Sequence, residues 1–331
     1  MSKVLHRKSA PGRVCLVGED IDWISGPSIL CAIDLRVHVG IKARLDNKNW
    51  ITVTSTEPLN YQKKLSLNEI GIYSGHESDY INAAIKVFSE RVSKITPMEI
   101  SIQSTLPAKA GLSSSAAVLV ATIAALCEHF RINVPDQEVC HLAYLAENQE
   151  LNTGVGQMDL YSCGLGGTLY LNSATTPPSP IERYTFPPDI SVIIVDTLTP
   201  RNTRDVIKEK RNRLLQSDPL LLAYVEHTLE AIDKIRKMLK KPTNNIKDIG
   251  NLVFTCHEYI RDYLQVSTDL LDECVERCKK SGALGAKLTG TGMGGCMFAL
   301  VEKNNEEKVI ASLLDLPVKV YATSISNSGI I

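Results

Sequence analysis

The chain has 331 residues and a mass of 36.4 kDa, and its 44% apolar and 22% charged residues are typical of an ordinary globular protein. Thirty-six basic and thirty-seven acidic residues give a formal net charge of −1. This balance argues against nucleic acid as the main ligand, because binding to a phosphate backbone needs a basic excess. No apolar run approaches the ~18 residues that a membrane span requires, and the first residues lack the apolar segment of a secretory signal. The length predicts about two domains, and we expect a small molecule as the partner.

The nine cysteines follow no metal-binding pattern. Cys274 and Cys278 lie one helical turn apart, but no pair of His or Cys residues at zinc spacing accompanies them. An odd and scattered set of cysteines is typical of reduced thiols that fill a core, and it predicts a cytoplasmic protein.

The first half of the chain begins with strands and continues with helices. Short apolar or alternating runs predict strands at residues 13–17, 28–33, 35–43, 50–54 and 100–104. Residues 116–130 are almost wholly apolar and predict a helix that is buried on nearly all sides. Residues 136–150 predict an amphipathic helix that begins just after Pro135.

The segment 173–189 contains five prolines and predicts a surface connection between two halves. We therefore place the domains at residues 1–180 and 181–331. The second half opens with a strand at 191–196, is helical to about residue 280, and ends with strands at 296–301 and 318–322. Strands and helices mix without a strict βαβ alternation, and the alternating strands favour antiparallel sheet, so the predicted fold class is α+β.

A segment rich in glycine and serine, residues 107–117, directly precedes the apolar helix. Glycine lets the backbone approach a ligand, and a helix that begins here would direct free N–H groups and the positive end of its dipole at an anion. The segment is not a Walker loop, but it predicts a phosphate site. A serine-rich cap before an ordinary core helix is the alternative.

A second glycine-rich segment spans residues 287–296. Gly290, Gly292 and Gly295 match the pattern G-x-G-x-x-G, but that dinucleotide fingerprint must open a helix, and here a strand is predicted to follow. Four glycines within residues 290–295 exceed what a hairpin turn needs. We therefore expect this loop to approach a ligand closely.

The third segment, residues 10–22, places Arg13 and three carboxylates, Glu19, Asp20 and Asp22, around an apolar run. A surface strand with solvated charges is one interpretation. The apolar run instead indicates burial, and buried charges need partners or a function. Taken alone, Glu147 on the second helix would be a surface residue. Asp159 after a glycine-rich bend would, taken alone, be a turn former.

In this order, and over residues 10–301, the three segments resemble the three motifs of the superfamily of galactokinase, homoserine kinase, mevalonate kinase and phosphomevalonate kinase, the GHMP kinases. The resemblance implies a two-domain α+β fold. Its N-terminal domain would be similar to domain 2 of ribosomal protein S5, and its C-terminal domain would be ferredoxin-like. ATP and a small-molecule acceptor would bind in the cleft between them.

The resemblance also implies roles for individual residues. Asp159 would be the base or orienting group for the acceptor hydroxyl, Arg13 would stabilise charge during phosphoryl transfer, and Ser115 and Glu147 would hold Mg²⁺. The ATP phosphates would lie on Lys109, Ala110, Gly111, Leu112, Ser113, Ser114, Ser115 and Ala116. The acceptor would lie on Glu19, Asp20, Asp22, Gly292 and Gly294.

Two branches of the superfamily compete for the acceptor. Segments 10–22 and 146–159 are similar to galactokinases, whereas segments 199–204, 210–215 and 286–290 are similar to mevalonate kinases. The chain departs from both branches at Asp20, where both carry His, and mevalonate kinases carry Lys at the position of Arg13.

The charge of the predicted pocket favours a neutral acceptor. Glu19, Asp20 and Asp22 would repel a carboxylate and accept hydrogen bonds from hydroxyl groups, unless a basic residue such as Arg201 faces the acceptor. We therefore expect an ATP-dependent kinase that phosphorylates a hydroxyl of a sugar or cyclitol. A mevalonate kinase or related acid kinase is the alternative, and a non-catalytic sugar-sensing regulator is disfavoured because the catalytic residues are present. The sequence leaves open whether the chain is a monomer or a homodimer.

Overall fold

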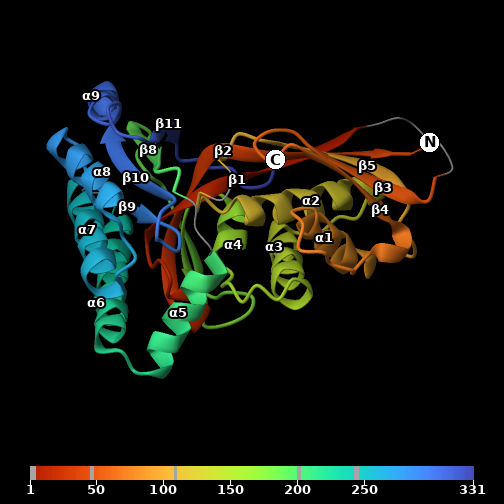
Figure 1. Ribbon diagram of the computed structural model, residues 1–331, viewed down its shortest axis with the longest axis horizontal. Helices are drawn as coiled ribbons and strands as arrows, with labels where there is room; N and C mark the ends of the chain where they lie inside the picture. The colour runs from red at the N-terminus through yellow and green to blue at the C-terminus, as the bar shows by residue number, and fades with distance from the viewer. Residues whose placement is uncertain (1–4, 45–47, 108–109, 200–202, 242–245) are drawn as a thin grey trace.

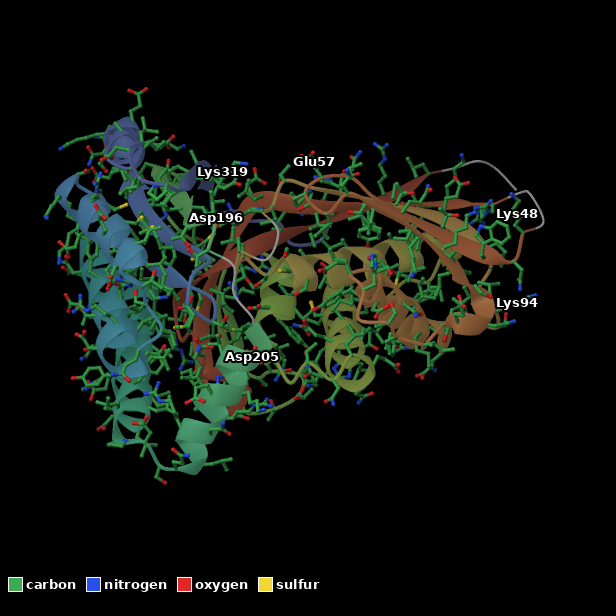
Figure 2. All side chains as sticks on the ribbon, viewed as in Figure 1. Lys48, Glu57, Lys94, Asp196, Asp205 and Lys319 are labelled. Atoms are coloured by element: carbon green, nitrogen blue, oxygen red, sulfur yellow. The ribbon has the colours of Figure 1, made fainter. Side chains whose placement is uncertain are left out.

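The protein is described by a computed structural model that covers residues 5–44, 48–107, 110–199, 203–241 and 246–331. Two β-sheets, each covered by its own helices, lie next to each other along the longest axis (Figure 1). Side chains fill the space between sheet and helices in both halves (Figure 2). This arrangement confirms the predicted α+β class.

The larger sheet is built around one long strand, β2 (Pro27–Ala43), which merges the predicted strands at 28–33 and 35–43. β1 (His6–Val17) pairs along most of one edge of β2, which holds it extended. On the other edge, the first part of β2 pairs with β6 and the last part pairs with β5. The sheet order is β4-β3-β5-β2-β6-β7, and the remaining strands are β3 (Trp50–Ser55), β4 (Tyr61–Ser66), β5 (Met98–Ser104), β6 (Thr168–Asn172) and β7 (Ile181–Tyr184).

Four helices cover one face of this sheet: α1 (Asp79–Ser89), α2 (Ser114–Phe130), α3 (Asp136–Leu145) and α4 (Met158–Leu165) (Figure 1). α2 packs against β1 and β2, and most of its residues are buried, as its apolar sequence predicts. The predicted helix 136–150 is divided, because α3 ends at Leu145 and Ala146–Glu150 form a π-helical turn. Such turns interrupt the regular spacing of side chains on a helix.

The smaller sheet is antiparallel, with the order β11-β8-β10-β9. Its strands are β8 (Ile190–Asp196), β9 (Gly285–Thr289), β10 (Cys296–Glu302) and β11 (Lys319–Ser324). The helices of this half are α5 (Thr203–Leu215), α6 (Pro219–Leu239), α7 (Ile246–Tyr259), α8 (Asp269–Lys280) and α9 (Glu306–Ala311). Short 3-10 turns occur at Asp22–Ile24, Leu67–Glu69 and Lys303–Asn305, and a second π-helical turn occurs at Ile260–Leu264. α5, which carries Asp205, lies between the two halves (Figures 1 and 2).

The two halves share one hydrophobic core. Val14 of β1, Ile193 of β8 and Leu288 of β9 belong to the same set of buried residues in contact. β7 pairs with β6 in the larger sheet, although it lies beyond residue 180. Residues 325–331 also return to that sheet, where Ile331 exchanges two backbone hydrogen bonds of 2.9 and 3.0 Å with Ser9.

The cysteines lie in the interior of the protein. All nine cysteines are free and buried, and burial raises the pKa of several of them, for example the pKa of Cys31 to about 12. The described part of the chain contains no group of His, Cys, Asp and Glu residues arranged to hold a metal ion by themselves. Within the same residues, no helix has the length and hydropathy needed to cross a membrane.

Candidate active site

A cavity of about 900 Å³ lies where the three glycine-rich or charged segments meet. β1 and the turn after it contribute Arg13 and Asp22 to its wall, and the start of α2 contributes the serines. The π-helical turn contributes Glu147, α4 contributes Asp159, and the loop between β9 and β10 contributes Gly290 and Thr291. Residues that are far apart in the sequence therefore border one space.

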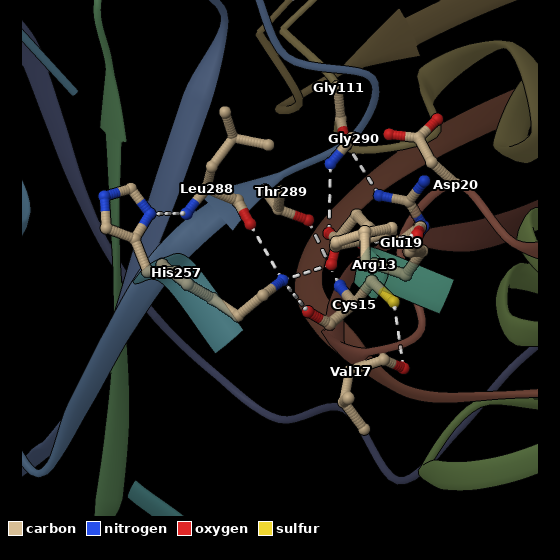
Figure 3. A network of polar contacts seen from close by, with 12 residues as sticks. Arg13, Cys15, Val17, Glu19, Asp20, Gly111, His257, Leu288, Thr289 and Gly290 are labelled. Atoms are coloured by element: carbon tan, nitrogen blue, oxygen red, sulfur yellow. Dashed lines mark hydrogen bonds and ion pairs between the residues drawn. The ribbon is translucent and has the colours of Figure 1, made fainter. Parts of the chain in front are cut away.

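Arg13 and Asp159 form a close pair at the wall of this cavity. The Arg13 Nε and Nη2 atoms lie 2.7 and 2.6 Å from Asp159 Oδ1, and Nη1 donates to the carbonyl oxygen of Gly111 at 2.7 Å. Burial disfavours the guanidinium charge, but Asp159, Cys15 and Glu19 together outweigh this effect, and the pKa of Arg13 lies above its ordinary value. Arg13 therefore joins the Asp159 carboxylate to the glycine–serine segment. Figure 3 shows its contact with Gly111.

The segment before α2 is held between the two halves of the molecule. The Arg13 amide donates to Leu112 O at 3.1 Å, and the Cys296 amide donates to Ala110 O at 3.0 Å. Gly111 (φ 88°) and Ser113 (φ 61°) adopt left-handed conformations that turn the chain into the helix. The buried Ser113 hydroxyl has no hydrogen-bond partner among the described residues.

The other residues predicted for this segment contribute in different ways. Ser114 and Ser115 line the cavity with Ser113. Leu112 and Ala116 are buried in the hydrophobic core, so they can offer a ligand only their backbone atoms. Lys109 lies outside the described residues.

Two acidic groups in the cavity wall have raised pKa values. Burial, and then the charges of Asp159 and Asp20, raise the pKa of Asp22 to about 7. Burial, and then the charges of Asp159 and Asp22, raise the pKa of Glu147 to about 8. The Asp22 carboxylate lies against Gly156, where a Cβ atom would overlap it. A cation bound between these groups would relieve their mutual repulsion.

Glu19 is fully engaged within the protein. One of its carboxylate oxygens forms an ion pair with the buried Lys287 of β9, and the other accepts the Gly290 amide at 3.1 Å (Figure 3). Lys287 also donates to Cys15 O at 3.0 Å and to Leu288 O at 2.9 Å. Glu19 thus ties the turn after β1 to the glycine-rich loop.

Asp20 is also paired with a lysine from the other half. The Lys210 Nζ atom of α5 lies 2.6 Å from Asp20 Oδ2 and donates to Thr291 O at 2.8 Å. Since Glu19 and Asp20 are neutralised by lysines, the expected repulsion of acidic acceptors rests on Asp22 rather than on three carboxylates. Arg201, which the sequence analysis considered as a counter-charge, lies outside the described residues.

The loop between β9 and β10 precedes a strand, as predicted, and contacts the cavity through its first residues. Gly290 and Thr291 line the cavity, and the Thr291 hydroxyl is buried without a partner among the described residues. Gly292 and Gly294 do not line it. At Gly292 (φ 82°) a Cβ atom would lie 2.5 Å from Val266, and at Gly294 (φ 114°) it would lie 2.9 Å from Thr199.

The sequence predicts no role for Lys210, Lys287 or Thr291. Their segments resemble family motifs or are rich in glycine, but a buried lysine has no local signal that separates it from a solvated one. The partner of Lys287, Glu19, lies 268 residues away in the chain, and the partner of Lys210 is Asp20, so only the tertiary structure identifies the pairs.

The chain is similar to known kinases over most of its length. Family models match at residues 79–167 (GHMP kinases N terminal domain), 228–316 (GHMP kinases C terminal) and 6–43 (galactokinase galactose-binding signature). A galactokinase from Thermotoga neapolitana is 29% identical, and the alignment covers 92% of this chain and 91% of that protein. A mevalonate kinase from Thermococcus sibiricus is 28% identical, with 97% and 96% covered.

Solved structures show the same architecture. The Methanococcus jannaschii mevalonate kinase has a TM-score of 0.83 and 25% identity, with 98% of each chain covered. The Lactococcus lactis galactokinase complexed with galactose has a TM-score of 0.85 at 23% identity, with 99% of this chain and 95% of that chain covered. The fold is that of a small-molecule kinase. The chain belongs to the GHMP kinases, and both the predicted superfamily and the predicted fold are confirmed.

Proposed function

We propose that this chain is an ATP-dependent kinase of the galactokinase type, which transfers the γ-phosphate to a hydroxyl group of a neutral sugar or cyclitol. The observation that carries the proposal is the contact between Arg13, Asp159 and Gly111, because it joins a carboxylate and a fixed positive charge to a phosphate-binding segment. Phosphoryl transfer requires positioning and electrostatic stabilisation above all, and these residues supply both.

The donor would occupy the part of the cavity that begins at α2. The three serines and the amides at the start of this 17-residue helix suit phosphate oxygens, because the helix N-terminus favours negative charge. Tyr61, Tyr73 and Tyr80 line the same cavity, and aromatic faces suit a nucleobase. Together they match the two chemical halves of ATP.

Glu147 and Ser115 would hold Mg²⁺, which prefers oxygen ligands and keeps several waters. The raised pKa of Glu147, which reflects burial and the neighbouring carboxylates, fits a group that gains a cation when the enzyme is loaded. When bound, the ion would neutralise charge on the β- and γ-phosphates. Glu147 and Asp159 line the same cavity.

Asp159 would accept the proton of the acceptor hydroxyl, or orient that hydroxyl for in-line attack. The Nε and Nη2 atoms of Arg13 both contact Oδ1, so we expect Oδ2 to accept the proton of the acceptor hydroxyl. Arg13 holds the carboxylate in place and offers its positive charge near the glycine–serine segment, where negative charge moves during transfer.

The acceptor would contact Asp22 and Asp20, which lie in the part of the chain that matches the galactose-binding signature. The neutralised Glu19 and Asp20 leave a pocket that suits hydroxyl groups. A mevalonate kinase is the second candidate, because mevalonate kinases match the chain with nearly the same identity as galactokinases. We propose a cytoplasmic location, since nine free thiols fit a reducing compartment.

A screen of ADP release across aldoses, uronic acids, cyclitols, mevalonate and homoserine tests the proposal. We expect a neutral sugar or cyclitol to give the highest kcat/KM. Release driven only by mevalonate would establish the acid kinase instead. A folded protein that binds sugar but releases no ADP with any acceptor would indicate the sensing regulator.

A further inference from the structure

We propose that Tyr73 is a positioning residue, whose hydroxyl group holds Glu150 and thereby fixes the π-helical turn that presents Glu147 to a metal ion. The inference deepens the proposed function and rests on it. It assigns a role to a contact in the cavity wall that takes no part in the phosphoryl transfer itself.

Tyr73 and Glu150 form a short hydrogen bond in the cavity wall. The Tyr73 hydroxyl donates to Glu150 Oε2 at 2.6 Å, which is the distance of a strong hydrogen bond to a carboxylate. Burial, and then the hydrogen bond to Glu150, raise the pKa of Tyr73, so the phenol keeps its proton and remains the donor. Tyr73, Glu150 and Glu147 all line the cavity. Because the hydroxyl is engaged with Glu150, only the ring of Tyr73 is left to contact a nucleobase.

Tyr73 lies on a segment that α1 holds in place on both sides. The Ile72 carbonyl oxygen accepts a hydrogen bond from Asn82 Nδ2 at 2.7 Å. The Ser74 amide donates to Asp79 Oδ2 at 2.7 Å. Asn82 and Asp79 belong to α1 and are buried. Both neighbours of Tyr73 are therefore attached to the helix, and its side chain reaches the π-helical turn from a fixed backbone.

Glu150 is the last residue of the π-helical turn. The Leu151 amide closes this turn on Ala146 O at 3.2 Å. The Thr153 amide and hydroxyl both donate to Glu147 O, at 3.3 and 3.2 Å. Turns of this kind are rare and are frequent at functional sites. The Glu147 carboxylate is placed only as well as the backbone that carries it, so a hydrogen bond that holds Glu150 also limits the movement of Glu147.

The placement of Glu147 matters because its carboxylate is buried beside other acids. Burial, and then the charges of Asp159 and Asp22, disfavour its charged form. Binding of a cation must offset this effect. When the backbone is already fixed, binding of the ion does not also have to order it. Loss of the Tyr73 hydrogen bond should therefore raise the concentration of Mg²⁺ that the enzyme needs.

The first measurement is hydrogen exchange of the protein without nucleotide or metal, followed by mass spectrometry of peptides that cover residues 146–153. We expect Tyr73→Phe to speed exchange of the Leu151 and Thr153 amides at least about threefold, part of the roughly tenfold effect of a hydrogen bond to a charged group. We expect Glu150→Ala to do the same. Glu150→Gln keeps an acceptor oxygen and should stay within about twofold of the parent rate. Peptides of α2 should be unchanged in all variants, which separates local opening from global unfolding.

The second measurement is the Mg²⁺ dependence of ADP release at fixed ATP and saturating acceptor. We expect Tyr73→Phe and Glu150→Ala each to raise the Mg²⁺ concentration for half-maximal activity at least about threefold, with the acceptor KM at saturating Mg²⁺ unchanged. The double variant should resemble the single ones, because both remove the same hydrogen bond. Tyr184→Phe is the matched control, since it removes the corresponding hydrogen bond to Glu182 on β7, and neither residue is among those that line the cavity.

Exchange at the parent rate in Tyr73→Phe and Glu150→Ala, or faster exchange with an unchanged Mg²⁺ requirement, would overturn the proposal. A higher ATP KM in Tyr73→Phe alone would also overturn it, because the hydroxyl would then contact the nucleotide rather than act through Glu150. A parent enzyme that releases no ADP with any acceptor, or a Glu147→Gln variant with an unchanged Mg²⁺ titration, would instead reject the proposed function itself. The two failures are therefore distinguishable.

Discussion

The contact between Asp159 and Arg13 concentrates two donors on one carboxylate oxygen, at 2.7 and 2.6 Å. Asp159→Asn keeps the size of the side chain but removes its charge and its ability to accept a proton. We expect kcat to fall at least about a hundredfold, within the range for removal of a general base. ADP release at saturating ATP and acceptor measures the change, and Asp233→Asn serves as the surface control. A near-normal rate would mean that Asp159 only forms a turn.

The raised pKa of Glu147 predicts how stability depends on pH. The folded value of about 8 lies above the ordinary value of 4.5, so the folded state binds more protons than the unfolded state between these two values. The free energy of unfolding therefore falls as pH rises from about 5 to 8, by at most about 1.4 kcal/mol per pH unit for this group. Urea unfolding at pH 6 and pH 8 should show a smaller difference in Glu147→Gln than in the parent. Equal slopes in the two proteins would contradict the prediction.

The proposed magnesium ligands give a third prediction at the residue scale. Ser115→Ala and Glu147→Gln each remove an oxygen ligand or its charge, so both should raise the Mg²⁺ concentration needed for half-maximal activity. A titration of ADP release against Mg²⁺ at fixed ATP measures this. Ser89→Ala, at the last residue of α1 and not among the residues that line the cavity, is the control for a lost hydroxyl. Unchanged titrations in both variants would leave Ser115 as a helix residue and Glu147 as a buried acid without a metal.

At the scale of elements, Gly292 in the loop between β9 and β10 has a matched control in Gly75, which precedes α1. Gly292 has φ 82° and a Cβ there would lie 2.5 Å from Val266, whereas Gly75 has φ 81° and nothing within 4 Å. Gly75→Ala should lower the free energy of unfolding by about 1–2 kcal/mol, the cost of a left-handed backbone conformation for alanine. Gly292→Ala adds the clash, so we expect a larger loss of unfolding free energy and lower activity. Equal losses in urea unfolding would show that the loop shifts without cost.

The elements also show what the sequence could predict. β1, β8 and α2 were predictable because their hydrophobic patterns are local and their burial follows the pattern. The π-helical turn at Ala146–Glu150 was not, because nothing in the spacing of its residues distinguishes it from the helix before it. The motif residues Arg13 and Asp159 were predicted from a family resemblance, whereas the two buried lysines depend on contacts between distant segments.

For the whole molecule, residues 325–331 hold together elements that come from the beginning and the middle of the chain. The buried guanidinium of Arg36 on β2 donates to Ser326 Oγ, Ser328 O and Gly329 O. The Ile330 amide donates to Gly164 O of α4 at 3.0 Å, and the Gly167 amide donates to Ser326 O at 2.7 Å. The segment therefore connects β1, β2 and α4, two of which carry the catalytic pair.

Arg36→Met should destabilise the protein by on the order of 3 kcal/mol, because several buried carbonyl and hydroxyl oxygens lose a charged donor. The unfolding free energy of Arg36→Lys should lie between those of the parent and Arg36→Met, since an ammonium group cannot reproduce the forked geometry of the guanidinium. Arg261→Met is the exposed control and should change the unfolding free energy by less than about 0.5 kcal/mol. Thermal or urea unfolding provides the comparison, and an Arg36→Met variant as stable as the control would refute the prediction.

Because every cysteine is buried, the rate at which each thiol is labelled reports how often the native protein opens around it. An exposed thiolate attacks an electrophilic thiol reagent, so each buried cysteine reacts only during an opening that brings it into water. Cys15 and Cys296 lie at the junction of the halves, where their amides donate to Thr289 Oγ1 and Ala110 O, whereas Cys140 lies within the first half. Labelling of the first two ahead of Cys140 would record the halves parting while each stays folded. Simultaneous labelling of all three would record global unfolding. ATP that bridges the halves would slow the labelling of Cys15 and Cys296 but not that of Cys140.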